Sequence, residues 1–166
     1  MTITGRSTSQ PEYTTQKNHL LHSSLVDGLA YSWSHTYNAS DDHTILLVKN
    51  TSTTHNLVID QIWCHCDTTT TVKVHHSEVA TPAGTAITAV WMKTGGSAPD
   101  AVAKGNDTGQ SGGLNVWQGS IAADSSTPIL VNSGLVLTEG FAVGVDYATG
   151  GSVEATVTII GHYEKT

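Results

Sequence analysis

The stretch VEATVTIIGHY, residues 153–163, decides the fold class. Its apolar side chains occupy every second position from 153 to 159, and Glu or Thr fills the positions between them. A period of two places the apolar side chains on one face of a β-strand and the polar ones on the other. The stretch therefore predicts a long strand with one buried face and one polar face.

Similar patterns extend outward from this stretch. Residues 31–37 alternate aromatic or imidazole side chains with Ser and Thr, and residues 44–49 form an apolar run. Further strands are expected at residues 57–66, 72–76, 86–92, 114–121, 128–132, 135–137 and 141–147. Clusters of Gly, Asn, Asp, Ser and Thr separate these segments, as turns do. About eight strands with regular turns predict an all-β fold, an antiparallel two-sheet sandwich of the jelly-roll type.

Two segments do not show this pattern. Residues 1–19 are polar, carry Pro11 and show no period, so we expect an N-terminal arm before a domain that spans residues 20–166. Residues 94–113 form a long, polar, glycine-rich connection, in which a short helix near residues 99–104 stays open. Long connections inside a compact domain usually have a function or face a partner.

The composition excludes several classes of protein. The chain of 166 residues has 7 Lys+Arg against 14 Asp+Glu, a net charge of -7, which is too acidic for electrostatic binding of nucleic acid. No apolar run approaches the roughly 20 residues of a membrane helix. The polar N-terminus predicts no secretory signal, so we expect synthesis in a reducing cytoplasm, where free thiols persist.

The only cluster with metal-ligand chemistry is Cys64, His65, Cys66, His75 and His76. A disulfide between cysteines two apart on a strand is disfavoured by its geometry, so we expect free thiols or half of a metal site. Cys64, Cys66 and His76 could together hold zinc, with a missing ligand supplied by a symmetric copy. The alternative is two buried thiols and two surface histidines.

The strand expected at residues 57–66 allows two faces. One carries Leu57, Ile59 and Trp63, and the other carries Ile62 and both cysteines. Because free Cys is usually buried, the second face is expected to be the more buried one toward the end of the strand.

No sequence motif for catalysis is present, so we do not expect an enzyme. Asp60 could face the interior and would then need a partner such as His76. The aromatic side chains of Tyr31, Trp33, Trp91 and others allow two interpretations, sugar stacking or packing in a core or between subunits.

Four stretches resemble a known family. They are LLVKNTSTTHNLVIDQI at residues 46–62, TPAGTAIT at 81–88, SGLVLTEGFAVGV at 133–145 and VTIIGHYE at 157–164. Together they are similar to the small β-sandwich virion proteins of tailed bacteriophages that decorate or cement the capsid. The resemblance implies a jelly-roll subunit, typically a homotrimer, that binds the major capsid protein on the outside of an icosahedral head and has no catalytic residues.

On this basis the arm and the connection at 94–113 are expected to contact the shell or neighbouring copies. The contact residues expected there are Thr4, Arg6, Pro11, Tyr13, Lys93, Asp100 and Lys104. An alternative is a receptor- or glycan-binding module of a phage fibre or tail. A third hypothesis is a cupin-like hydrolase that uses the His/Cys cluster.

Overall fold

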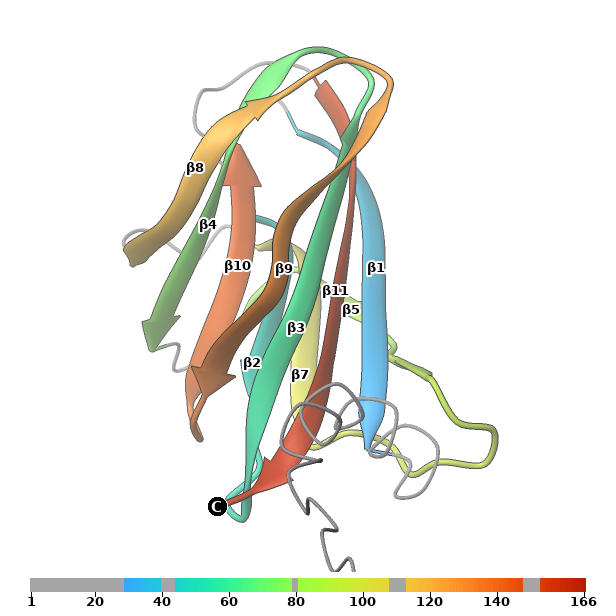
Figure 1. The fold of residues 1–166 in the computed structure, drawn as a ribbon, viewed down its shortest axis with the longest axis vertical. Coiled ribbons are helices and arrows are strands. Elements are labelled where there is room, and N and C mark those ends of the chain that lie inside the picture. The colour runs from blue at the N-terminus through green and yellow to red at the C-terminus, as the bar shows by residue number, and fades with distance from the viewer. Residues whose placement is uncertain (1–28, 40–43, 79–80, 108–112, 148–152) are drawn as a thin grey trace, which may run out of the picture.

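The chain forms two antiparallel β-sheets packed face to face (Figure 1). The computed structural model describes residues 29–39, 44–78, 81–107, 113–147 and 153–166, and these contain strands and no helix. The described residues accordingly include no helix that could cross a lipid bilayer. The prediction of an all-β, antiparallel two-sheet sandwich is confirmed.

The first sheet has five strands, which run from one edge to the other in the order β6-β1-β11-β3-β9. Their bounds are β6 Val90–Trp91, β1 Ala30–Ala39, β11 Val153–Lys165, β3 His55–Cys66 and β9 Ser125–Leu137. The stretch that decides the fold class is therefore the central strand β11.

The second sheet has six strands in the order β5-β7-β2-β10-β4-β8. Their bounds are β5 Thr85–Ile87, β7 Ala101–Asp107, β2 Thr44–Asn50, β10 Phe141–Tyr147, β4 Thr70–Glu78 and β8 Leu114–Ile121. On one side of the sandwich the edge strands are β9 of the first sheet and β8 of the second. On the other side they are β6 of the first sheet and β5 of the second.

The described strands outnumber the eight or so that the sequence predicts, because the segment between β4 and β8 holds β5, β6 and β7. The short helix considered near residues 99–104 is wrong, since β7 occupies this place and pairs with β2 from Asn50 to Thr44. The backbone of this polar segment is satisfied by pairing along β2, so its strand depends on a tertiary contact that local composition does not encode.

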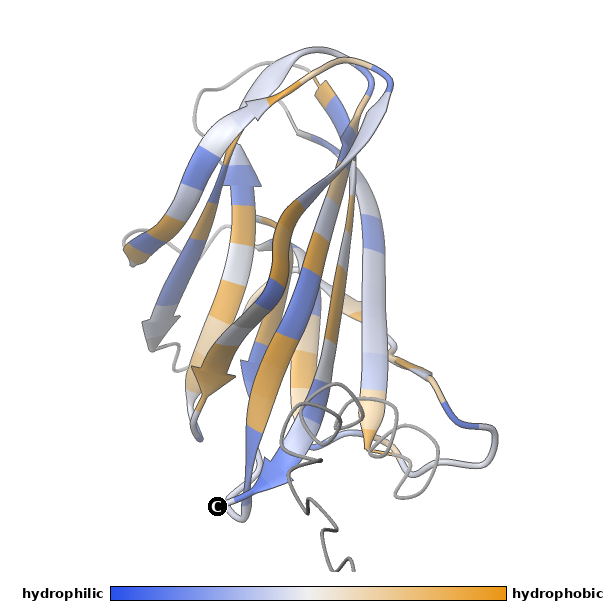
Figure 2. Ribbon diagram, viewed as in Figure 1, coloured by the Kyte–Doolittle hydropathy of each residue, from blue (hydrophilic) through white to orange (hydrophobic). Residues whose placement is uncertain are grey.

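The core between the sheets follows the alternation read from the sequence. Val153, Ala155, Val157 and Ile159 are all buried, and Tyr31 and Trp33 of β1 are almost fully buried beside them. The hydroxyl-bearing residues of β1 point away from the core, where Ser34 and Thr36 meet two threonines of β11. Figure 2 shows the resulting mixture of hydrophobic and hydrophilic positions along each strand.

Strand β3 changes face at a β-bulge. Gln61 lies opposite Ile160 and Ile59 lies opposite Gly161, so Asp60 is an extra residue in the ladder with β11. Leu57 and Ile59 therefore enter the core before the bulge, and Ile62 and the two cysteines enter it after the bulge. Each of the two faces predicted for this strand is therefore the buried face in one half of the strand. The extra residue shifts the alternation by one position, so the side chains after it point to the opposite face.

Candidate functional site

The side of the sandwich formed by β8 and β9, hereafter the uncharged side, has no Asp, Glu, Lys or Arg in either strand. Four of its large apolar side chains are exposed, with exposed fractions from 43% to 78%: Leu114, Val116, Val131 and Val136. Within the part of the chain that the structure describes, each of these strands lies at a sheet edge and has a hydrogen-bonded neighbouring strand on one side only. Apolar side chains beside such an edge are typical of an interaction surface.

Trp63 extends this surface onto the outer face of the first sheet. It lies on β3 opposite Pro128 of β9, and 38% of it is exposed. Its indole Nε1 donates a hydrogen bond to Gln61 Oε1 at 3.1 Å, which fixes the ring beside the edge strand. A fixed aromatic ring loses little conformational entropy when a partner covers it.

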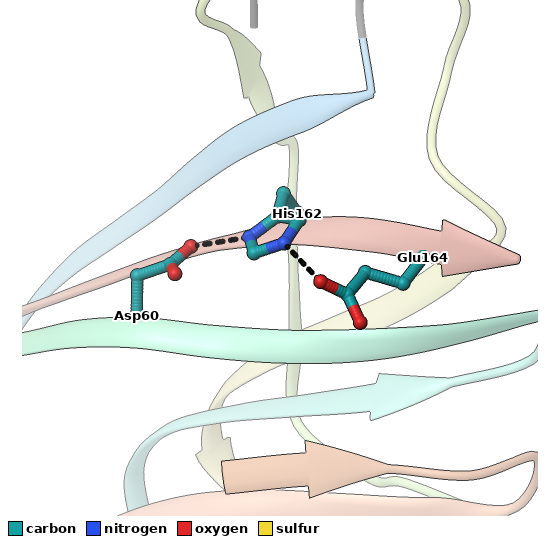
Figure 3. Close-up of polar contacts among 3 residues, drawn as sticks. All are labelled: Asp60, His162 and Glu164. Carbon is teal, nitrogen blue, oxygen red and sulfur yellow. Dashed lines mark hydrogen bonds and ion pairs between the residues drawn. The ribbon is translucent and has the colours of Figure 1, made fainter. Parts of the chain in front are cut away.

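A polar cluster lies on the same outer face, beside the bulge of β3 (Figure 3). His162 of β11 is buried, and its Nδ1 lies 2.8 Å from Asp60 Oδ2. Its Nε2 lies 3.2 Å from Glu164 Oε1. Both ring nitrogens therefore face carboxylates, and only the protonated imidazolium can donate to both.

The two carboxylates control the charge of this imidazole. Burial lowers the pKa of His162, but the hydrogen bonds and charges of Asp60 and Glu164 outweigh burial, so its pKa is raised above 6.5. Asp60 thus has its partner in His162 rather than in His76, which corrects the expectation from the sequence. The cluster holds a charged pair at the bulge and has the geometry of a structural ion pair.

A second buried ion cluster lies on the other sheet. Asp146 of β10 alternates with core residues, and its Oδ2 lies 2.9 Å from His75 Nδ1 and 3.7 Å from Lys73 Nζ. His75 and Asp146 are both nearly inaccessible. The expectation that His75 is a surface histidine is wrong, because the carboxylate of Asp146 on the adjacent strand gives it a buried partner.

The two cysteines are free and buried, as the sequence predicts. Their Sγ atoms lie 3.7 Å apart in the core. The hydrogen bond with Cys66, together with burial, raises the pKa of Cys64, while the same hydrogen bond lowers the pKa of Cys66. The Cys64 thiol therefore stays protonated, and one of the two thiols donates to the other.

The zinc hypothesis required these thiols to meet His76. The cysteines lie on β3 of the first sheet, whereas His76 lies on β4 of the second sheet and stacks on Phe141 at 5.2 Å. Within the described ranges, no three His, Cys, Asp or Glu residues are grouped so that they could hold a metal ion.

Of the contact residues expected from the sequence, Thr4, Arg6, Pro11 and Tyr13 lie outside the described residues, as does the arm of residues 1–19.

The other three lie between β4 and β8, at the opposite side from β8 and β9. Lys104 is on β7, Lys93 follows β6, and Asp100 is exposed just before β7. Burial and the nearby Asp100 carboxylate raise the pKa of Tyr31. These residues are not brought together with the apolar surface of β8 and β9.

The uncharged side was not among the sites predicted from the sequence. The signal was available, because residues 114–137 contain only one charged side chain, Asp124, in the turn between the two strands. The sequence does not show that both strands are edge strands of their sheets. The aromatic residues also divide in the structure: Tyr31 and Trp33 pack in the core, whereas Trp63 and Trp91 are exposed.

Comparison of the chain with models of protein families, with curated proteins and with solved structures finds no match.

Proposed function

We propose that this chain is a virion structural protein, a jelly-roll subunit that binds the outside of an icosahedral phage head and stabilises the capsid without catalysis. Its partners are the major capsid protein and further copies of itself, as a homotrimer. Its place is the capsid surface, after synthesis in the host cytoplasm. The resemblance to phage decoration proteins and the strand order both support this proposal.

The strand order is the observation that carries it. With β5, β6 and β7 set aside, one sheet reads β1-β11-β3-β9 and the other reads β2-β10-β4-β8. Along the chain, the pairs β1/β2, β3/β4, β8/β9 and β10/β11 each cross from one sheet to the other. This wrapping is typical of eight-stranded jelly rolls, which recur in viral capsid proteins, lectins and cupins. Among these, the resemblance favours the virion role.

The outer face of the first sheet also suits a mechanical role. Ser34 and Thr158 share a hydrogen bond of 2.9 Å across β1 and β11, and Thr36 and Thr156 share one of 2.7 Å. Cross-strand hydroxyl pairs stabilise neighbouring strands without adding charge. Strands tied together in this way form a stiff module, which suits a protein that covers and stabilises a shell.

The test is to mix the purified protein with phage heads assembled without it. We expect saturable binding at a fixed copy number that is a multiple of three, and a higher temperature of shell disruption. Absence of saturable binding to any such head would contradict the proposal.

A variant that lacks residues 1–18 tests the contribution of the arm. We expect it to bind the same heads more weakly while it keeps its melting temperature, because the arm adds contacts to the shell. Equal binding of the shortened and full chains would exclude the arm as a contact.

Recognition of glycans by a fibre or tail module is the second candidate, and the exposed indoles of Trp63 and Trp91 favour it. Aromatic faces stack on sugar rings when solvent can reach them. Binding of the protein to a glycan array, lost in Trp63→Ala or Trp91→Ala, would support this candidate over the capsid role.

A further inference from the structure

The two sides of the sandwich end in very different strands. On one side, the edge strands β5 and β6 have 3 and 2 residues. On the uncharged side, the edge strands β8 and β9 have 8 and 13 residues. Short edge strands and charged side chains are the usual protections against edge-to-edge association, and β8 and β9 have neither.

Strand β9 has other features that limit its pairing. Pro128 lacks a backbone donor, and positive φ angles at Asn132 and Gly134 bend the strand next to the bulge of β3. Continuous strand addition along the whole of β9 is therefore disfavoured. Contact through side chains, with pairing over short lengths, fits this edge better than an unlimited stack of sheets.

We propose that the uncharged side, formed by β8 and β9, is the surface on which a second copy of this chain docks. Each copy has a net charge of -7, so two copies repel one another over most of their surfaces. The uncharged side has no charged residue in either strand, and its exposed apolar residues can pack against the uncharged sides of neighbouring copies around the axis of the proposed homotrimer. A second copy is thus the partner whose chemistry this side fits.

The size of the surface agrees with such a contact. Strand β9 has 13 residues, so it spans roughly 40 Å, and two stacked sheets with their side chains give a depth of about 20 Å. The resulting area of about 800 Å² is the area that each partner buries in an interface of standard size. Trp63, beside the edge, supplies the kind of aromatic residue that dominates such interfaces.

This inference rests on the proposed function, because it names the surface through which copies of the virion protein associate. Its test needs no capsid: sedimentation of the purified full chain over a range of concentrations. We expect the wild-type protein to form a trimer. We expect Val116→Glu combined with Val131→Glu to raise the dissociation constant at least tenfold.

The matched control is Val90→Glu combined with Met92→Glu. These residues are similarly exposed, but they lie on or next to β6 at the opposite side, and the substitutions add the same two negative charges. The control should associate like the wild-type protein. Equal weakening in both variants would assign the effect to total charge and overturn the proposal.

Leu114→Glu serves as a second variant, because its side chain is the most exposed of the four and its replacement least disturbs folding. Melting temperatures show whether each variant is folded. A wild-type protein that remains a monomer at all concentrations would refute docking of a second copy. Such a monomer could still bind phage heads, so the two proposals fail separately.

Discussion

The two sides of this sandwich differ in whether other segments of the chain cover the edges of the sheets. On the side of β5, β6 and β7, hereafter the insertion side, the chain covers its own edges, and Tyr31 Oη donates a hydrogen bond of 2.9 Å to the carbonyl of Ser97. The Thr51 amide donates another to the carbonyl of Asp100. The uncharged side has no such cover among the described residues. The difference indicates that a polar, glycine-rich segment can protect an edge, while apolar strands without charge leave an edge for a partner.

The largest effect should come from filling a glycine on the insertion side. A Cβ at Gly105 of β7 would overlap the ring of His35 from the opposite sheet. We expect Gly105→Ala to lower the free energy of unfolding by about 2–3 kcal/mol, because the overlap lies between two packed sheets. Chemical denaturation measures the loss.

The matched change on the uncharged side is Gly119→Ala in β8. There, a Cβ would meet the ring of Trp117 at 2.5 Å, but this ring is only partly buried and can move outward. We expect a loss of about 1 kcal/mol or less. A larger loss at Gly119 than at Gly105 would show that the uncharged side is packed as tightly as the insertion side.

A medium effect should come from His162, whose partner Asp60 forms the bulge that faces β9. The pKa of His162 is raised in the folded protein, so its stabilisation is complete below pH 6.5 and is lost as the pH rises through the folded pKa. We expect His162→Gln to lower the free energy of unfolding by about 1–2 kcal/mol at acidic pH, and by less at alkaline pH.

Melting curves of both proteins from about pH 5.5 to about pH 8.5 measure this difference. His65→Gln on β3 is the control and should keep the pH dependence of the wild-type protein. A gap between wild type and His162→Gln that widens toward high pH would contradict the assignment.

A smaller effect than that of His162→Gln should come from Tyr31→Phe, which removes the hydrogen bond to Ser97. We expect a loss of about 1 kcal/mol, together with faster proteolysis between β6 and β7. The comparison variant is Gln61→Ala, which removes the acceptor of the exposed Trp63 indole. It should change stability by no more than about 0.5 kcal/mol, since water replaces an exposed hydrogen bond. Equal losses of stability in Tyr31→Phe and Gln61→Ala would contradict the conclusion that the insertion side is covered and the uncharged side is not.

The parts of the fold with a regular period were predictable from the sequence. Strand β10 matches its predicted bounds, and β11 buries the expected alternate residues. The bulge at Asp60 was not predictable, because nothing in residues 55–66 marks which residue leaves the ladder. Strand β7 was not predictable either, since it forms by pairing with β2.

The candidate site likewise has features that the local sequence predicts and features that depend on which strands pair. The burial of Cys64 and Cys66 was foreseeable from the preference of free thiols for the interior. The partnership of Asp60 with His162 joins residues 102 positions apart, and it exists only because β3 and β11 are neighbours in the sheet. The exposure of β8 and β9 likewise depends on the sheet order, which composition does not specify.

The two thiols are the only ones in the chain, and both are enclosed between the sheets. A reagent that modifies sulfur can therefore reach them only when the layers separate. The rate of modification therefore measures how often the two sheets separate in the native protein, and no engineered label is needed. Thiol modification thus reports transient separation of the two sheets, and its rate can be measured both for the protein in solution and for the protein attached to a shell.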